Sequence, residues 1–260
     1  MTMWREQKVV VVFPTYNEKD SIRAAIEDFF SSSYVDEIIV VNNNAAPGTK
    51  EEVEKTRAIQ VFESKQGYGH AIQRGVQEAL QLGADLIIIS EPDGTFAGHD
   101  CMKLLAYSDD FPVVFGTRTA ETLIWDGANM GWFLKWGNFA VAKMMELLFN
   151  TNELSDVGCT MRCLHRSVLS GLQPLFTVGG SHFGPELMML VISHQIPFVE
   201  IPLNYKQRVG ESSVTGDFWK AWRLGWRMIF MIIGTRIRTW LRPYDPNGIE
   251  LDFKRHKGAL

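Results

Sequence analysis

Residues 85–96, which read DLIIISEPDGTF, decide how the rest of the chain is interpreted. The run LIII at 86–89 is apolar and largely β-branched, as is typical of a strand that is buried on both faces of a sheet. Pro92 cannot donate a hydrogen bond to a strand ladder, and Gly94 permits a sharp turn. The strand is therefore predicted to end near Ser90 and to be followed by a tight acidic loop.

The loop places two carboxylates, Glu91 and Asp93, directly after the predicted strand. Open α/β sheets bind their ligands at the carboxyl ends of the strands. Two hard oxygen donors with an open neighbourhood suit Mg²⁺ or Mn²⁺ that is held jointly by the protein and the diphosphate of a substrate. The alternative is a turn whose acids only face water, because two acids separated by one residue form a weak motif on their own.

The composition is that of a globular protein with one large domain, with or without an appendage. The 260 residues are 46% hydrophobic and 22% charged, and the formal net charge of −4 gives no general attraction to nucleic acid. The three cysteines form neither a disulfide framework nor a CxxC pair, which favours a reducing compartment. The apolar run 9–13 is too short for a signal peptide, and no run is long enough to cross a bilayer.

The first hundred residues alternate between predicted strands and predicted helices. Strands are predicted at 8–13, 37–41, 59–62 and 86–89. Helices are predicted at 19–30 and 50–57, and a third helix is predicted to end at Leu82. Short loops and right-handed crossovers then favour an α/β fold with a mainly parallel sheet and helices on both faces. Three of the loops should converge on one crevice, as in nucleotide-binding proteins.

The loops at this edge of the sheet carry polar side chains and glycine. The segment PTYNE at 14–18 follows the first strand and precedes a helix, whose start favours anions. Three asparagines at 42–44 end the second strand and offer amide donors and acceptors. The glycines of KQGYGH at 65–70 permit close approach of the backbone to a ligand, although a plain strand-to-helix loop explains them equally well.

The second half of the chain carries basic residues at comparable places. A predicted strand at 113–115 runs into Arg118, where a fixed guanidinium would either clamp a phosphate or form a surface salt bridge. The segment 156–162, DVGCTMR, brings an acid and a base into one tight stretch. A further predicted strand at 198–205 ends near Arg208.

Two long helical segments are rich in aromatic residues. The segment 132–149 is interpreted either as a core helix or as a helix against a membrane or lipid chain, and both interpretations stay open. In 217–242 an apolar face at three- and four-residue spacing lies beside a basic face, with six basic residues against one acid. This pattern favours a helix in the plane of an anionic membrane surface, with a helix packed on the domain or in a dimer as the alternative.

The order of these motifs along the chain is more specific than any one of them. The motifs are PTYNE at 14–18, the turn at 42–44, QGYG at 66–69, EPD at 91–93, GTR at 116–118, GN at 137–138, D-x5-R at 156–162 and R-x-GES at 208–212. From about Val9 to Ser213 this order resembles the family-2 glycosyltransferases with the GT-A fold. Within that family the chain is similar to the polyprenyl-phosphate sugar synthases, such as dolichyl-phosphate mannose synthase.

The resemblance implies a role for each matching residue. The nucleotide would be bound by Pro14, Thr15, Tyr16, Glu18, Asn42, Asn43, Gly67 and Glu91. Mg²⁺ or Mn²⁺ on the donor diphosphate would be held by Glu91 and Asp93. The catalytic residues would be Asp93, Arg118, Asp156 and Arg208. The acceptor and its phosphate would be bound by Arg118, Lys135, Asn138, Arg162, Glu186 and Arg208.

The activity that the resemblance implies is an inverting, metal-dependent transfer of a hexose from a nucleotide diphosphate sugar to a polyprenyl phosphate of the dolichyl or undecaprenyl type. Residues 1–215 would form the catalytic domain, 216–245 an amphipathic helix on a membrane surface and 246–260 a tail. The enzyme would be peripheral on the cytoplasmic face of the membrane, with no nucleic-acid partner, and a homo-oligomer is left open.

Two other functions stay open at this point. Transfer to a hydroxyl group of a glycan or small molecule would need a general base, and Asp156 or Glu186 would have to serve. A non-catalytic nucleotide-sugar binding protein is suggested by the turn at 42–44, where the family has an acid and this chain has three asparagines. The retained acids and arginines of the other motifs argue for an enzyme.

Overall fold

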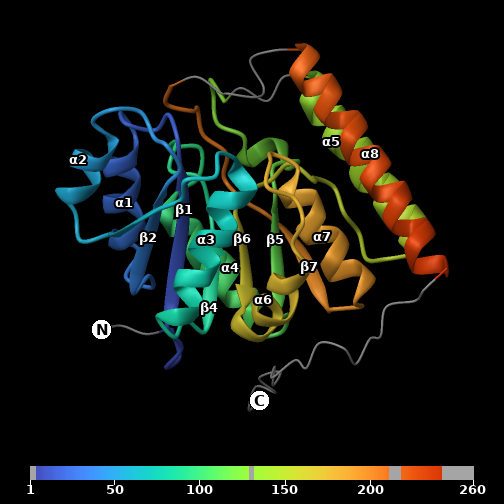
Figure 1. The fold of residues 1–260 in the computed structure, drawn as a ribbon, viewed down its shortest axis with the longest axis horizontal. Coiled ribbons are helices and arrows are strands. Elements are labelled where there is room, and N and C mark those ends of the chain that lie inside the picture. Colours follow the sequence, from blue (N-terminus) through green and yellow to red (C-terminus); the bar gives the residue numbers. More distant parts are fainter. Residues whose placement is uncertain (1–3, 129–131, 211–217, 242–260) are drawn as a thin grey trace.

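The computed structural model describes residues 4–128, 132–210 and 218–241, and one mixed sheet runs through this part of the chain (Figure 1). Within it the sheet has seven strands in the order β3-β2-β1-β4-β6-β5-β7. The strands are β1 (Val9–Thr15), β2 (Glu37–Asn42), β3 (Ile59–Phe62), β4 (Leu86–Ile89), β5 (Val113–Thr117), β6 (Arg162–His165) and β7 (Phe198–Pro202). Neighbouring strands are parallel, except that β6 is antiparallel to both β4 and β5. The predicted α/β fold with a mainly parallel sheet is confirmed.

Helices flank the sheet on both sides (Figure 1). The α-helices are α1 (Ile22–Ser31), α2 (Thr49–Glu54), α3 (Tyr68–Gln81), α4 (Cys101–Ser108), α5 (Trp132–Phe149), α6 (Arg166–Leu172), α7 (Phe183–Ser193) and α8 (Phe218–Leu241). Short 3₁₀ turns lie at Gly98–Asp100, Glu121–Leu123 and Gln173–Leu175. The predicted helices at 19–30 and 50–57 are both present but shorter than expected.

The central strands β1 and β4 are buried on both faces, as the apolar run at 86–89 predicts. All residues of β1 and β4 are buried, and they pair in register from Val9 with Leu86 to Val12 with Ile89. Successive side chains alternate between two hydrophobic clusters, one on each face of the sheet. Helices α1, α2 and α4 contribute to one cluster, and α3, α5, α6, α7 and α8 contribute to the other.

The antiparallel strand β6 is the part of the sheet that the sequence did not reveal. It has four residues, RCLH, beginning at Arg162 and ending at His165. A strand this short, with a base at each end, has too little periodicity to be distinguished from a loop. The predicted strand at 198–205 also ends early, at Pro202, and Tyr205 forms only an isolated bridge to Ile124.

Helices α5 and α8 lie side by side along one flank of the molecule (Figure 1). In α8, Met228 and Ile232 are buried in the core cluster, whereas Phe230 and Trp240 on the same helix are 67% and 77% exposed. The predicted helix at 217–242 therefore packs on the domain with one face and presents aromatic side chains with the other. In α5, Met145 is buried and Leu147 is exposed.

None of the described helices is both long enough and apolar enough to cross a membrane. The proposed tail at 246–260 lies outside the described residues, and the boundaries proposed for the domain and the helix stay predictions.

Candidate active site

Asp93 lies in the tight turn after β4, and its side chain is completely buried. Its Oδ1 accepts hydrogen bonds from the backbone N–H and the hydroxyl of Thr95, at 2.9 and 2.5 Å. Its Oδ2 accepts no hydrogen bond from the described residues, although Nη1 of Arg208 lies 3.0 Å away as an ion pair. The turn therefore fixes one oxygen of the carboxylate and leaves the other facing Arg208.

Arg208 lies among three carboxylates, of which two come from the loop after β4 and one comes from the PTYNE loop. Besides Asp93, its guanidinium lies 3.1 Å from Oε1 of Glu18 and 3.9 Å from Oε2 of Glu91. The backbone of its segment is tied to the acid loop, because the N–H groups of Lys206 and Val209 donate to the carbonyls of Thr95 and Asp93, each at 2.8 Å. The sequence predicts Arg208 as a phosphate ligand but gives no sign of this contact with the acid loop.

The carboxyl group of Glu91 lies at the edge of the cleft, with a quarter of the side chain exposed. The pKa of Glu91 is raised to about 8, chiefly by desolvation and then by the charge of Asp93, while the charge of Arg208 opposes the rise. Crowded carboxylates behave in this way when positive charge nearby is too little to compensate them. The pair would therefore gain from an additional cation.

The acid loop suits a divalent cation. Glu91 and Asp93 supply hard carboxylate oxygens of the kind that Mg²⁺ and Mn²⁺ prefer. The buried Oδ2 of Asp93 has a lone pair that no hydrogen bond uses. Among the described residues, no group of three or more His, Cys, Asp or Glu side chains is arranged as a metal site. The protein would therefore contribute these two side chains, and a ligand would have to contribute the remaining donors.

The PTYNE loop is held by its own glutamate. Oε2 of Glu18 accepts hydrogen bonds from the backbone N–H groups of Tyr16 and Asn17, at 2.6 and 2.8 Å, while its other oxygen pairs with Arg208. Pro14, Thr15 and Tyr16 line the cleft, and the buried hydroxyl of Thr15 has no partner among the described residues. Glu18 thus shapes the loop, and Pro14, Thr15 and Tyr16 face the cleft.

Asn43 organises the loop on the other side of the cleft. Its Nδ2 donates to the carbonyls of Glu63 and Lys65, and its Oδ1 accepts from the backbone N–H of Gly67 at 2.8 Å. Asn43 and Gly67 line the cleft, but Asn42 does not, and its Oδ1 instead accepts from the N–H of Ala45. The asparagines therefore build the turn and hold the glycine loop in place.

The glycines of this loop are needed by the protein's own backbone. A Cβ atom on Gly67 or on Gly69 would collide with the backbone carbonyl of Gly179 or Val178, respectively. The N–H of His70 donates to the carbonyl of Gly179 at 3.1 Å. The close approach that the glycines permit is thus to residues 178–179, and of the two glycines Gly67 also lines the cleft.

Arg118 and Asp156 form a bidentate ion pair beside the cleft. Nε and Nη2 of Arg118 donate to the two carboxylate oxygens at 2.7 and 2.9 Å, and the N–H of Gly158 also donates to Asp156. Burial acts to lower the pKa of Arg118, but the charge of Asp156 and its hydrogen bonds outweigh burial and raise the pKa. The ring of Tyr205 lies 5.1 Å from the guanidinium. Arg118 is therefore fixed and charged, whereas Asp156 is fully occupied.

Glu200 of β7 supports the segment that carries Asp156, and no pattern in the sequence singles out this residue. Its Oε2 accepts from the backbone N–H of Ser155 at 2.7 Å and from its hydroxyl, and its Oε1 accepts from the N–H of Asp156 at 3.2 Å. Burial raises the pKa of Glu200 to about 7, against the opposing effect of the Ser155 hydrogen bond. The predicted strand at 198–205 offered no reason to distinguish this acid from acids that face solvent.

Arg162 and Glu186 are both buried but are used differently. Arg162 lines the cleft and donates to the backbone carbonyls of Gly184 and Cys159, and burial lowers the pKa of its guanidinium. Glu186 does not line the cleft. Its carboxylate accepts from the backbone N–H groups of Thr177 and Val178 and from the hydroxyl of Thr177. Glu186 therefore fixes the loop before α7.

Asn138 and Lys135 lie on the same helix, α5, with different surroundings. Asn138 lines the cleft. Lys135 does not, and its Nζ lies 2.8 Å from Oε1 of Glu121 in an exposed ion pair. The structure thus brings Asn138, and not Lys135, to the other predicted phosphate ligands.

All of these elements meet around a cleft of about 1390 Å³ at the carboxyl ends of the strands. One side is polar and includes Glu18, Glu91, Arg118, Arg162 and Arg208. The other side is apolar and comes from α5 and α8, with Val141, Trp222, Trp226, Met228 and Ile229. Helix α8, which the sequence predicts to lie on a membrane surface, thus also forms a wall of the cleft.

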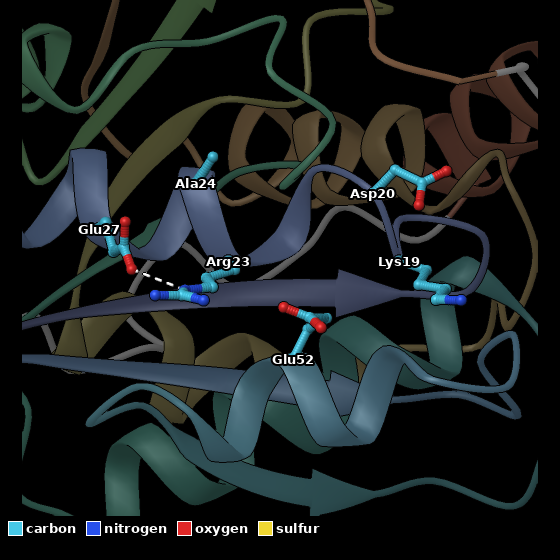
Figure 2. A pocket seen from close by; sticks show the side chains of 6 residues that line it. All are labelled: Lys19, Asp20, Arg23, Ala24, Glu27 and Glu52. Carbon is cyan, nitrogen blue, oxygen red and sulfur yellow. Dashed lines mark hydrogen bonds and ion pairs between the residues drawn. The ribbon is translucent and has the colours of Figure 1, made fainter.

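A second, smaller hollow of about 350 Å³ lies over α1 and α2 (Figure 2). Figure 2 shows its charged side chains on the loop before α1 and on the two helices, with Arg23 paired to Glu27 at 2.9 Å. Its lining residues are Lys19, Asp20, Arg23, Ala24, Glu27 and Glu52. Because bases and acids alternate and none is buried, this hollow has the properties of an ordinary solvated surface.

Gly158 allows Arg118 and Asn138 to approach each other, so Gly158→Ala tests the geometry of the cleft. A Cβ atom would lie 2.5 Å from Nδ2 of Asn138 and 2.7 Å from Nη2 of Arg118, and both side chains would have to move. We expect kcat/KM to fall by about 100-fold, because displacements of about 1 Å have effects of this size. Gly234→Ala in α8 is the control, since its Cβ would meet nothing within 4 Å. Equal activity of the two variants, measured by nucleotide release, would contradict the expectation.

The sheet topology and the cleft at the carboxyl ends of its strands have a GT-A type of architecture. The model of the family "Glycosyl transferase family 2" matches residues 10–172, and the chain therefore belongs to glycosyltransferase family 2. The resemblance drawn from the sequence motifs and the prediction of an enzyme are confirmed.

Relatives and solved structures agree with this placement. The chain is 29% identical to glycosyltransferase AglJ of Haloferax volcanii over 44% of its own length, and it spans only 37% of that relative. It is 25% identical to a dolichyl-phosphate hexose transferase of the same organism over 82% of this chain and 90% of that one. A crystal structure of Mycobacterium tuberculosis glucosyl-3-phosphoglycerate synthase, with Mn²⁺, UDP and phosphoglyceric acid, superposes with a TM-score of 0.68 at 13% identity, covering 89% and 79% of the two chains. At that identity the likeness establishes the fold.

Proposed function

We propose that the protein transfers a sugar, with inversion, from a nucleotide diphosphate sugar to a polyprenyl phosphate. The observation that carries the proposal is that the two candidate general bases, Asp156 and Glu186, are already engaged by other groups of the protein. Asp156 is bound bidentately by Arg118, and Glu186 is bound by Thr177 and Val178. Neither is free to deprotonate a hydroxyl group, whereas a phosphate acceptor is already anionic and needs no general base. A relative named dolichyl-phosphate hexose transferase supports the same acceptor class.

The acids that line the cleft in the described residues are Glu18 and Glu91. Glu18 is engaged by Arg208 and by its own loop. Glu91 would hold Mg²⁺ or Mn²⁺ together with Asp93, and the ion would neutralise the diphosphate that leaves. The structural neighbour crystallised with Mn²⁺ and UDP supports this assignment.

The remaining steps are carried by residues of the chain itself. Arg118, held rigidly by Asp156, would orient the acceptor phosphate with Asn138 beside it, for attack in line with the leaving group. Thr15, Tyr16 and the loop fixed by Asn43 would hold the nucleoside. The apolar wall from α5 and α8 would accommodate the first part of the lipid chain, because Trp222 and Ile229 line the same cleft as the arginines.

We propose that the outer face of α8 lies on the cytoplasmic surface of a membrane, which would bring the cleft to a lipid acceptor. Phe230, Ile237 and Trp240 are exposed aromatic or aliphatic residues on this helix, and Arg223 and Arg227 are exposed bases. An apolar face beside a basic face, with tryptophan near the helix ends, matches the chemistry of an anionic interface.

Phe230→Ser tests membrane contact with a closely matched control. We expect binding to phosphatidylglycerol-containing vesicles to weaken by about tenfold, because a buried phenylalanine contributes roughly 1.5–3 kcal/mol. Phe62→Ser is the control, since Phe62 on the edge strand β3 is 60% exposed and Phe230 is 67% exposed. Co-sedimentation at low and high salt gives the measurement, and binding should also weaken with salt. The same loss in both variants would argue against an interface on α8.

A donor screen tests the central proposal. Purified protein is incubated with Mn²⁺ or Mg²⁺, a polyprenyl phosphate and a panel of nucleotide sugars, and nucleotide release is measured. Release that requires both the metal and the lipid phosphate is the expected result. Release with a phosphate-free hydroxyl acceptor, or binding of donors without release, would contradict it.

A further inference from the structure

The two arginines at the polar side of the cleft are held in different ways. Arg118 is paired bidentately with a single buried partner, Asp156, and its pKa is raised. Arg208 instead faces three carboxylates, at 3.0 Å from Asp93, 3.1 Å from Glu18 and 3.9 Å from Glu91. None of these three contacts is a bidentate pair, and the buried Nε of Arg208 has no partner among the described residues. Arg208 thus lies among three negative charges, but no bidentate pair fixes the orientation of its guanidinium.

Arg208 lies against Oδ2 of Asp93, which is the oxygen that a cation bound by Glu91 and Asp93 would need. Oδ2 of Asp93 lies 3.0 Å from Nη1 of Arg208, whereas Oδ1 accepts its hydrogen bonds from Thr95. Glu91 is the other carboxylate that suits a divalent ion, and it also faces Arg208. A guanidinium and a divalent cation beside the same carboxylates repel each other, and both need the space around the same oxygen atoms.

We propose that Arg208 and the divalent cation exclude each other from Asp93 and Glu91, so that binding of the cation releases Arg208 to bind the anionic phosphate of the acceptor. This inference rests on the proposed function for the identity of the anion. The competition for the acids stands on the contacts of Arg208 alone. Arg208 is the exchangeable arginine of the cleft, and Arg118 is the fixed one.

The release requires a movement of the side chain and no movement of its backbone. The N–H groups of Lys206 and Val209, on either side of Arg208, donate to the carbonyls of Thr95 and Asp93. These bonds keep the Cα of Arg208 at the acid loop while the guanidinium turns. Because Arg208 already lines the cleft and a quarter of its side chain is exposed, a rotamer change brings it towards solvent on that side.

The coupling is reciprocal by thermodynamic necessity. If the cation frees Arg208 for an anion, then an anion on Arg208 raises the affinity for the cation by the same factor. The acceptor would therefore bind tightly only to the metal-loaded protein. The cation would then bind with or before the nucleotide sugar, and the acceptor phosphate would bind afterwards. This order of binding would protect the donor.

The decisive test is Mn²⁺ affinity in the variant Arg208→Gln, measured by electron paramagnetic resonance of the free ion without nucleotide or lipid. Removal of a competing cation should tighten Mn²⁺ binding by about tenfold, which is of the size of typical coupling between two sites. A residue with a merely structural role would weaken binding or leave it unchanged. Lys206→Gln is the control: it removes the same charge from the same segment, but Lys206 lies over the ring of Trp125 and forms no ion pair with the acids.

A second measurement separates this inference from the proposed function. Binding of a short-chain polyprenyl phosphate is titrated with and without Mn²⁺, and Mn²⁺ should raise the affinity in the natural protein and in Lys206→Gln but not in Arg208→Gln. Equal or weaker Mn²⁺ binding by Arg208→Gln, with an unchanged melting temperature, would overturn the competition. Failure of the lipid arm with tighter Mn²⁺ binding in Arg208→Gln would overturn the phosphate acceptor and leave the competition standing. Absence of Mn²⁺ binding in every variant would overturn both.

Discussion

Asp93→Asn is expected to reduce turnover by about a thousandfold or more, because it removes a charged metal ligand and the charge that balances Arg208. The substitution keeps the shape of the side chain, and its Oδ1 can still accept the two hydrogen bonds from Thr95. The fold should therefore survive, and the loss should appear in kcat together with a loss of Mn²⁺ affinity. Nucleotide release, Mn²⁺ titration and a thermal melt measure the three quantities.

The matched control for this prediction is Asp20→Asn. Asp20 lines the solvated hollow over α1 and α2 (Figure 2). Its replacement by asparagine removes one negative charge but does not touch the loop of Glu91 and Asp93. It should behave as the natural protein in all three measurements. Asp93→Asn with at least a tenth of normal turnover would show that the acid loop is a turn and not a metal site.

Asp156→Asn is expected to lower the free energy of unfolding by about 3–5 kcal/mol, the usual cost of removing one partner from a buried ion pair. Asp156 is buried, and Arg118 is only 12% exposed, so solvent screens the pair weakly. The variant should also lose acceptor affinity, because the guanidinium is no longer held in one orientation. Denaturant unfolding and the KM for the lipid phosphate give the two readouts.

A double-mutant cycle with Arg118→Gln isolates the interaction from the two separate losses. The exposed pair of Arg23 and Glu27 on α1 serves as the control cycle, since pairs of that kind contribute about 0.2–1 kcal/mol. A coupling free energy for Arg118 and Asp156 as small as that of the control would contradict the view that the pair is a rigid clamp.

The first half of the fold and the acid loop were predictable because local signals there agree with tertiary structure. Strand β4 is a continuous apolar run buried on both faces, and a proline and a glycine after it force the turn that carries Glu91 and Asp93. The order of the motifs predicted that Arg118 and Arg208 lie at the same cleft, and in the structure both residues line it.

The rest depended on contacts between residues far apart in the chain. Glu200 accepts a hydrogen bond from the backbone of Ser155, and Arg208 donates one to Glu18, which lies 190 positions earlier in the chain. A short strand such as β6 carries no periodicity, and an amphipathic helix such as α8 does not disclose how much of its apolar face the domain covers. Pairings of this kind leave no pattern in a single sequence.

The antiparallel strand β6 constrains the order in which the protein can be assembled during translation. Along the chain it follows β4 and β5, yet in the sheet it lies between them. A nascent chain that ends before Arg162 therefore has β4 paired on one side only, and β5 has no neighbour at all, which leaves edges that are prone to association. Asp156, which holds Arg118, and Arg162, which lines the cleft, are synthesised just before or with this strand, so closure of the sheet and completion of the polar side of the cleft are one event. Strand β6 must therefore leave the ribosome before any folding intermediate can both pair the free edges of β4 and β5 and bind substrate.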